Sequence, residues 1–485
     1  YYRSSGAGAI FVYGNIKNPK IRMHRVEVMR GESFGGHGGG FLTASTIGNK
    51  VNSQIDISYI TLHDIQHVGV TQEGAVIGWT NAGTWDENPD AYVKIVHMQV
   101  NRASGGTASS QQGTFFFEGF KDIRVTNSNF HNSEAGDGGL FRIASFVNFY
   151  SENNSFYKNF GGDVGGAIYI YDGAQAASKI DKTNPSKKRS IVFKNDEFYG
   201  NSAGKSLAKG DGGAVAIKAG AADIPCDVTI ENCNFKNNST TALEGGAAWI
   251  GVAGEVNIKN SIFCNNNANT KGASGTGAGG AMRIAGSSKR VNIEGCYFSE
   301  NTTKKGGGAI ELQSGGEYFL KNNVFSHNYS NDAESAGMPA GGALSVADGI
   351  IHAENCKFIG NQGGYLGAVG LLNNGTTGDH TFTMCEFTDN KAQQNGAAIG
   401  MRKLGGTMLI TNCTFTNNEA GNDGGVLYVN SLGKFTLKNN TFNGNKAASK
   451  GGVAWISGDS YVKSYNNRYY NNQAMQGGVI RYQDD

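Results

Sequence analysis

Proline is nearly absent from this sequence: 5 of its 485 residues are Pro, whereas 73 are Gly. Proline has no backbone N–H and is therefore largely excluded from the interior of hydrogen-bonded strands. Glycine instead permits tight turns with positive φ. Together the two counts predict a chain that turns often and keeps nearly all of its backbone donors for strand pairing.

Long apolar segments and a strong net charge are also missing. No apolar run approaches the roughly 18 residues that a membrane-spanning helix needs, so no membrane insertion is expected. The formal net charge is +2 and 17% of the residues are charged, which argues against a nucleic-acid partner. The chain starts at Tyr1 without a signal segment, which indicates that such a segment was removed or that the sequence is a fragment.

A repeat occupies most of the chain, and its clearest copy is 228–250, VTIENCNFKNNSTTALEGGAAWI. Apolar and polar residues alternate, then come Asn, a small residue, Phe, a second Asn, a variable stretch, Gly-Gly-Ala and another alternating segment. Alternation with a period of two is typical of strands that bury one face. Because one copy cannot bury its apolar face alone, the copies must stack on one another. The sequence predicts an all-β fold, a single-stranded parallel β-helix (solenoid).

Two asparagine positions recur relative to the Phe of each copy. The first lies three residues before the Phe, as in Asn232 and Asn260, and the second lies three residues after it, as in Asn238 and Asn266. Asparagine tolerates left-handed backbone, and its amide both donates and accepts hydrogen bonds. We therefore predict two ladders of stacked asparagines. The outward residue just before the first Asn alternates in charge over five copies: Glu231, Lys259, Glu294, Lys321 and Glu354. If the copies stack, each charge lies between two opposite charges, which is favourable.

The repeat predicts the domain organisation. Residues 1–126 are interpreted as irregular N-terminal coils and residues 127–485 as regular repeats, which together form one continuous solenoid of about sixteen coils. Surface loops rich in small or charged residues interrupt it at 101–113, 172–190, 266–278 and 329–340. Neither a capping helix nor a polar terminal repeat is recognisable, so open coils are expected at both ends.

Seven cysteines are present, and five share the position two residues before the Phe: Cys233, Cys296, Cys356, Cys385 and Cys413. Other copies carry Ser, Asn or Asp there, so we interpret the position as one for a small side chain and the cysteines as free thiols. A disulfide between neighbours such as Cys385 and Cys413 is the alternative. No C-x-x-C pair or nearby His is present, so no metal and no cofactor are expected.

A candidate binding surface follows Gly-Gly-Ala, where one outward position of the second strand carries aromatic and basic side chains. Such side chains can stack on sugars or contact another protein, although strand propensity also favours aromatic residues. The candidate binding residues are Tyr169, Trp249, Arg283, Tyr428, Trp455 and Arg481. The preceding small residue, as in Ala167 and Ala343, is expected to form a shallow strip beside them.

The Asn-x-Ser/Thr sequences indicate candidate glycosylation sites. Asn374 and Asn237 are the expected acceptors. Six further sites coincide with the two asparagine positions of the repeat and are expected to be unmodifiable: Asn153, Asn238, Asn301, Asn328, Asn412 and Asn439.

The repeated F-x-x-N, as in Phe235–Asn238 and Phe298–Asn301, followed by Gly-Gly-Ala-Ile, as in Gly165–Ile168 and Gly307–Ile310, resembles the repeats of chlamydial polymorphic outer-membrane proteins. This resemblance covers roughly residues 127–482 and lies within the pectin-lyase-like superfamily of right-handed parallel β-helices. It implies a right-handed coil, an extracellular or cell-surface location, and an adhesin-like scaffold without catalytic residues.

Three functions are compatible with these patterns. The first is a non-enzymatic structural subunit of a surface filament or appendage, whose copies assemble head-to-tail through the open terminal coils. The second is an adhesin or polysaccharide-binding β-helix that recognises surface glycans. The third is a carbohydrate-active lyase or hydrolase, which Gly36-His37-Gly38 and Gln483-Asp484-Asp485 suggest only weakly because they lie at opposite ends of the sequence.

Overall fold

The structure is a computed structural model. It describes residues 10–12, 16–34, 41–44, 52–68, 76–81, 89–105, 113–136, 138–172, 188–205, 210–220, 225–268, 277–331, 340–372, 378–402, 406–430, 433–458 and 460–483. The chain divides into two compact units, each considered by itself below. The first unit comprises Tyr1–Leu243 and Ala247–Glu255, and the second comprises Glu244–Gly246 and Val256–Asp485.

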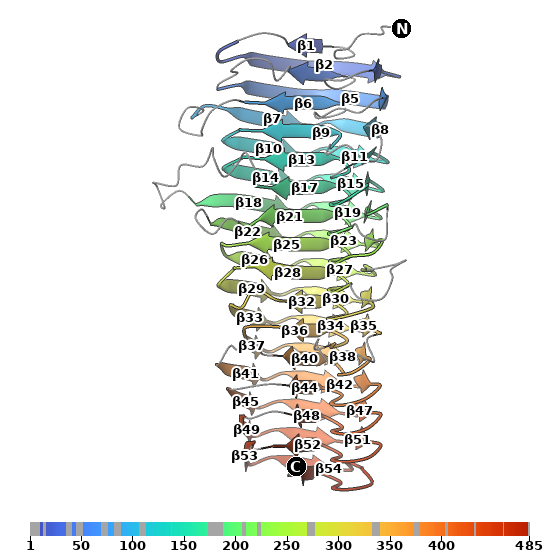
Figure 1. Ribbon diagram of the computed structural model, residues 1–485, viewed down its shortest axis with the longest axis vertical. Helices are drawn as coiled ribbons and strands as arrows, with labels where there is room; N and C mark the ends of the chain where they lie inside the picture. Colours follow the sequence, from blue (N-terminus) through green and yellow to red (C-terminus); the bar gives the residue numbers. More distant parts are fainter. Residues whose placement is uncertain are drawn as a thin grey trace. The chain divides into compact units, whose positions relative to one another are not determined.

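Each unit is built from short parallel strands, and the described residues contain no helix. In both units one sheet, named here the Gly-Gly sheet, consists of the strands that follow the glycine pairs (Figure 1). In the first unit its strands are β1 (Ile10–Val12), β4 (Leu42–Ala44), β6 (Ile77–Thr80), β9 (Phe115–Glu118), β13 (Phe141–Ala144), β17 (Ile168–Tyr171), β21 (Val215–Ala219) and β25 (Ala248–Val252). In the second unit they are β28 (Met282–Gly286), β32 (Ile310–Leu312), β36 (Leu344–Val346), β40 (Val369–Leu372), β44 (Ile399–Arg402), β48 (Leu427–Asn430), β52 (Ala454–Ser457) and β55 (Ile480–Gln483).

The strands on either side of the first asparagine form the other main sheet of each unit, named here the Asn sheet. In the first unit it holds β2 (Lys20–Met29), β3 (Glu32–Phe34), β5 (Gln54–Val68), β7 (Tyr92–Val96), β8 (Gln99–Gly105), β10 (Asp122–Thr126), β11 (Asn129–His131), β12 (Glu134–Ala135), β14 (Asn148–Glu152), β15 (Ser155–Tyr157), β16 (Phe160–Gly161), β18 (Arg189–Lys194), β19 (Glu197–Tyr199), β20 (Ser202–Ala203), β22 (Cys226–Glu231), β23 (Asn234–Lys236) and β24 (Ser239–Thr240).

The second unit repeats this arrangement. Its Asn sheet holds β26 (Val256–Lys259), β27 (Ile262–Cys264), β29 (Arg290–Glu294), β30 (Tyr297–Ser299), β33 (Glu317–Lys321), β34 (Val324–Ser326), β37 (Ile350–Glu354), β38 (Lys357–Ile359), β41 (Asp379–Thr383), β42 (Glu386–Thr388), β45 (Thr407–Thr411), β46 (Thr414–Thr416), β49 (Lys434–Lys438), β50 (Thr441–Asn443), β53 (Tyr461–Tyr465) and β54 (Arg468–Tyr470). A small third sheet contains β31 (Thr302–Thr303), β35 (Tyr329–Ser330), β39 (Gln362–Gly363), β43 (Lys391–Ala392), β47 (Glu419–Ala420) and β51 (Lys446–Ala447).

This architecture confirms the predicted all-β parallel β-helix. The regular turn recurs about 12 times, from β9 to β54, rather than sixteen times. The difference arises in the earliest part of the chain, where β5 extends over 15 residues and pairs with both β7 and β8, which are separate strands.

The predicted phenylalanine column forms the core of both units. In the first unit the rings of Phe156, Phe198 and Phe235 stack with centroids 4.7 and 4.5 Å apart. In the second unit a corresponding stack runs from Phe263 to Tyr469 with centroid distances of 4.6–5.0 Å. These spacings equal one strand separation. Each ring is therefore held between its counterparts in the adjacent coils, in a geometry favourable for aromatic pairs.

The asparagines three residues after the Phe form a buried ladder. In the second unit the Oδ1 of Asn361 accepts two hydrogen bonds from Asn328, one from its backbone N–H at 3.1 Å and one from Nδ2 at 2.9 Å. The Nδ2 of Asn361 donates to the carbonyl of Phe325 and to Oδ1 of Asn390. The same bonds link Asn159, Asn201 and Asn238 within the first unit. This ladder was predicted correctly, and it satisfies the backbone donors at every bend.

The asparagines three residues before the Phe are exposed and adopt left-handed backbone, for example Asn153 at φ 56° and Asn355 at φ 50°. Some of them pair, as when Nδ2 of Asn355 donates to Oδ1 of Asn322 at 2.8 Å. The second ladder is thus an outer one. It leaves Asn153, Asn412 and Asn439 exposed, whereas Asn238, Asn301 and Asn328 of the inner ladder are buried.

The position two residues before the Phe, where the five cysteines lie, forms a third line of stacked side chains. Each of these side chains can accept a hydrogen bond from the backbone N–H of the equivalent residue in the preceding coil. The backbone N–H of Asn154 donates to Asp196 Oδ1 at 2.8 Å, that of Cys296 to Asn323 Oδ1 at 2.9 Å, and that of Cys385 to Cys413 Sγ at 3.3 Å. A small side chain with an acceptor atom is therefore required there. All five cysteines at this position are buried free thiols, as the sequence predicted.

The glycine pair brings successive coils into close contact. A Cβ on Gly308 would lie 1.9 Å from the carbonyl oxygen of Gly342, so no side chain fits. The alanines that follow the pair, such as Ala309 and Ala343, are fully buried. The expected shallow surface strip is therefore part of the core, because these side chains point inward.

Coil β53–β55 differs from the preceding coil at three core positions. Ser464 follows Leu437 in register, Tyr469 follows Phe442, and Tyr482 follows Ile456. The new hydroxyl groups are hydrogen-bonded: Ser464 Oγ lies 3.0 Å from Tyr469 Oη, and Tyr482 Oη donates to the carbonyl of Gly458 at 2.8 Å. This coil therefore carries hydrogen-bonded hydroxyl groups at positions that are apolar in the preceding coil.

Candidate functional site

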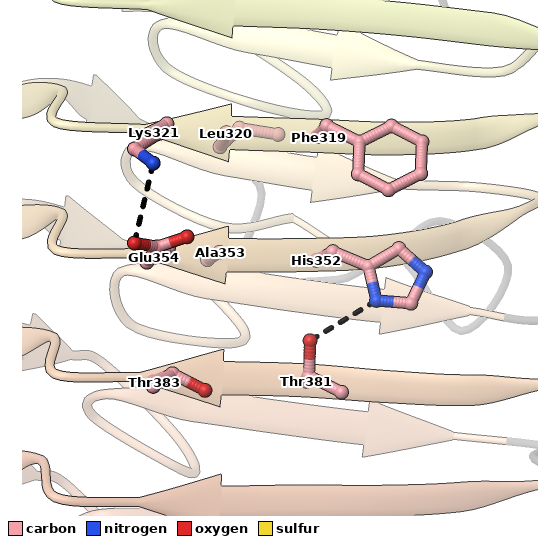
Figure 2. A pocket seen from close by; sticks show the side chains of 8 residues that line it. All are labelled: Phe319, Leu320, Lys321, His352, Ala353, Glu354, Thr381 and Thr383. Carbon is pink, nitrogen blue, oxygen red and sulfur yellow. Dashed lines mark hydrogen bonds and ion pairs between the residues drawn. The ribbon is translucent and has the colours of Figure 1, made fainter.

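A half-open groove of about 240 Å³ lies on the outer face of β33, β37 and β41 in the second unit. Figure 2 shows two parallel columns of side chains, one from each edge of the groove. One column consists of Phe319, His352 and Thr381, and the other of Lys321, Glu354 and Thr383. Strand alternation produces this arrangement, because Leu320 and Ala353 between the columns point into the core.

The aromatic column is a continuous stack. The Arg290 guanidinium lies 4.3 Å from the centroid of Phe319, whose ring stacks on His352 at 5.0 Å with an interplanar angle of 18°. His352 Nδ1 is 3.0 Å from the hydroxyl of Thr381. Both faces of Phe319 are covered, so a ligand in the groove would meet the ring edges and the imidazole rather than an open aromatic face.

The charged column supplies one cation and one anion. Lys321 Nζ lies 3.4 Å from Glu354 Oε1, and both side chains are about half exposed. This pair confirms the predicted alternation of charge, which continues in register from Lys259 to Glu294 and Lys321. Among the described residues that line the groove, Glu354 is the one carboxylate.

The six predicted binding residues are divided between the two units. Tyr169 and Trp249 belong to the first unit and are half-buried, with Tyr169 stacked on Tyr171 at 4.8 Å and Lys218 5.2 Å from the Trp249 ring. In the second unit Tyr428, Trp455 and Arg481 follow one another in register. Arg481 is exposed.

Two of these residues contradict the expectation that the position faces solvent. Tyr428 is 6% exposed and Trp455 is 7% exposed, and their rings stack at 4.7 Å. Leu366 and Tyr365, from the corner that follows Gly363-Gly364 in the sequence, pack against them. The corner folds back over the outer face of the Gly-Gly sheet, so residues that alternation places outward become buried.

Arg283 stands beside a residue that the sequence analysis did not single out. It forms an ion pair with Glu244 and a hydrogen bond with Gln313, and it is adjacent in register to Glu311. Glu311 is fully buried; its Oε2 accepts from the N–H of Gly307 at 3.2 Å, and its Oε1 has no partner among the described residues. Burial raises the pKa of Glu311 to about 7. The sequence did hold a signal for this site, because Glu311 stands at a position where other coils carry Ser or Gly.

Of the remaining sequence-based sites, the structure describes Asn237. Asn237 is exposed, at φ 57°, whereas Asn374 lies outside the described residues, as do His37 and Asp484. No cluster of three or more metal-ligating side chains occurs in the part of the chain that the structure describes. Burial raises the pKa of Cys296 to about 12, so this thiol stays protonated and unreactive.

The fold defines the class of protein: a right-handed parallel β-solenoid with an internal asparagine ladder. Two segments, residues 295–313 and 412–430, match the Chlamydia polymorphic membrane protein (Chlamydia_PMP) repeat. Each runs from the bend before the Phe to the strand after the glycine pair. No curated protein and no solved structure matches the chain. Among the described residues, no helix is both long and apolar enough to cross a bilayer.

Proposed function

We propose that this protein is a non-enzymatic β-helical scaffold associated with a cell surface. The observation that carries the proposal is that identical side chains from successive coils stack in the interior of each unit. Such stacking produces a repetitive framework whose outer face can vary in sequence. Two segments similar to a repeat of membrane proteins support the surface location. Assays for released reducing sugar and for unsaturated products test the non-enzymatic part, because activity on any polysaccharide would overturn it.

The finer proposal is that copies assemble end to end. Strand edges β53, β54 and β55 present side chains that an added coil would cover, including Tyr461, Tyr465 and Ile480, each more than one-third exposed. A parallel coil from a second copy would pair with these edges through backbone hydrogen bonds. Such a contact joins different surfaces of the two copies and repeats without closing, which is the geometry of a filament.

Sedimentation and electron microscopy at rising concentration test this assembly. We expect filaments of stacked copies, and we expect Ile480→Lys to reduce assembly because it places a charge at the edge of β55. Thr436→Lys, on the outer face of β49, is the matched control and should leave assembly unchanged. A monodisperse monomer at high protein concentration would exclude end-to-end assembly and leave the scaffold proposal intact.

A second candidate function is polysaccharide binding in the groove of β33, β37 and β41. The observation that favours it is the combination of ring edges, a hydroxyl group and an ion pair in one concave surface, the kind of lining that contacts both C–H groups and hydroxyls of sugars. A glycan array with wild type and His352→Ala tests this function. Equal binding by both forms would place any glycan site elsewhere.

A further inference from the structure

The outer bend, which is the left-handed position three residues before the Phe, carries different residue types in the earliest coils of the first unit. From β10 onward the left-handed residue at this bend is asparagine: Asn127, Asn153, Asn195 and Asn232, with φ of 51–56°. In the three preceding coils the same bend is formed by Arg25, Tyr59 and His97, with φ of 53–55°. In the corresponding column of the second unit, replacement of Asn is isolated, as at Gly295 and Met384.

Left-handed backbone costs Arg25, Tyr59 and His97 more free energy than it would cost an asparagine at the same bend. Left-handed backbone costs an ordinary L-residue about 1–2 kcal/mol, and bulky side chains in this region are genuine outliers. The turn does not need them, since Asn127 occupies the next equivalent bend and accepts a hydrogen bond from Nδ2 of Asn153 at 3.2 Å. Strained residues that persist without a structural need are characteristic of functional sites.

The side chains at this bend form an exposed aromatic cluster. Tyr59 stacks on His97 with centroids 4.7 Å apart, and His24 meets Tyr59 edge-on at 5.3 Å. His24 Nδ1 lies 3.0 Å from Ser58 Oγ. Half of the Tyr59 surface remains exposed despite these contacts. The cluster is thus held in position by its neighbours while part of its surface stays open to a ligand.

Cationic side chains surround the cluster. Arg22 and Arg25 extend from β2 and Lys94 from β7; all three are exposed, and none forms an ion pair within residues 16–34, 52–68 and 89–105. In register, Asp56 stands between Arg22 and Lys94. The surface therefore offers unpaired cations for an anionic group and a carboxylate that can accept hydrogen bonds from hydroxyls.

We propose that this surface binds an acidic polysaccharide, with a sulfate or carboxylate group on Arg25 and Lys94 and a sugar ring against the exposed part of Tyr59. A nucleic acid fits less well, because Asp56 interrupts the positive charge at the point where successive phosphates would lie. The site lies in the first unit, so it does not depend on end-to-end assembly or on the groove of the second unit.

Binding of the full chain to dextran sulfate, polygalacturonate, uncharged dextran and single-stranded DNA tests the proposal. The variant Tyr59→Asn/His97→Asn continues the asparagine column toward Asn127, so we expect thermal stability equal to or above that of wild type. We also expect it to bind the two acidic polysaccharides at least tenfold more weakly. Lys94→Gln lies outside the bend and should weaken the same binding severalfold without any change of backbone.

Met384→Asn is the matched control. It replaces an exposed bulky residue at the equivalent bend of the second unit, so it should raise stability in the same way and leave polysaccharide binding unchanged. Unaltered affinity of the Tyr59→Asn/His97→Asn and Lys94→Gln variants would overturn the site. Equal affinity for DNA, or for uncharged dextran, would overturn the assignment of its ligand.

Discussion

At the scale of single residues, most polar side chains in the interior of the described chain are amides, hydroxyls or thiols, and Asp196 is the carboxylate in its line of acceptors. Asn154, in the coil before it, fills the same position with a neutral group, and Cys233 does so in the coil after it. Asp196 Oδ1 accepts from the N–H of Asn154, but Oδ2 has no partner in the described part of the chain. Burial raises the pKa of Asp196 from 3.8 to about 7.

This carboxyl group makes stability depend on pH. A folded-state pKa above the unfolded value means that the native protein holds the proton more tightly, so stability is highest below about pH 4 and falls as pH rises to about 7. We expect Asp196→Asn to remove the part of this decline that Asp196 causes and to leave the part that the buried Glu311 causes. At pH 8 the variant should be more stable by about 2–4 kcal/mol. Denaturant unfolding at pH 4.5 and pH 8 measures the difference.

A matched variant controls for local packing. Asn323→Asp places a carboxyl group at the equivalent buried position of the second unit, where the Asn now accepts from the N–H of Cys296 and donates to the carbonyl of Ile293. It should lower stability at pH 8 and show the pH dependence that Asp196→Asn loses. Equal stability of wild type and Asp196→Asn at both pH values would contradict the assigned burial of the charge.

At the scale of elements, the inner asparagine ladder joins strands that are far apart in sequence. We expect Asn361→Ala to reduce stability by about 2–5 kcal/mol, because it removes the partners of the Asn328 donors, the Phe325 carbonyl and Asn390 Oδ1. Asn355→Gly, at the exposed outer bend, removes one solvent-accessible bond and should cost less than about 1 kcal/mol. Equal losses for both variants would contradict a structural role specific to the buried ladder.

The same elements show what the sequence alone could predict. Identical residues at fixed spacing, such as Phe358 and Phe387 or Asn361 and Asn390, must lie in adjacent coils, so the stacks, the inner ladder and the alternating charges were predicted correctly. Burial of Tyr428 and Trp455 was not predictable. It depends on Leu366 and Tyr365, which belong to a corner of variable sequence whose path has no repeating pattern.

The candidate site illustrates a related limit. Glu311 and Asp196 were visible in the sequence as unusual members of their columns, but their raised pKa values follow from burial. For Glu311, burial depends on the corner around Gly306, where an added Cβ would lie 2.5 Å from Glu311 Oε2. Likewise, the cluster of His24, Tyr59 and His97 lies in coils too irregular to align by eye with the later asparagines.

At the scale of the whole molecule, the hydroxyl groups of coil β53–β55 bear on self-association. Ser464, Tyr469 and Tyr482 occupy positions that are apolar in the preceding coil, so this face keeps polar groups where a continuous core would have none. An interface formed here must retain or replace those hydrogen bonds, and it should therefore be weaker than the junctions between interior coils.

The triple variant Ser464→Leu/Tyr469→Phe/Tyr482→Ile should associate at a concentration at least tenfold lower than wild type, because it exposes more apolar surface on the same strand edges. Analytical ultracentrifugation over a concentration series measures the change. Thr436→Val removes a hydroxyl from the outer face of β49, in the preceding coil, and should have no effect. Unchanged association of the triple variant would show that this face takes no part in self-contact.

The asparagine ladder also has a direction. Asn445 sends one amide hydrogen back to the carbonyl of Phe415, and it sends its other amide hydrogen and its backbone N–H forward to the single oxygen of Asn472. A newly folded coil thus completes the previous one and is itself left incomplete until the next arrives. A chain that folds from its amino end can therefore be stabilised coil by coil, because each added coil supplies the acceptor for the amide donors of the coil before it.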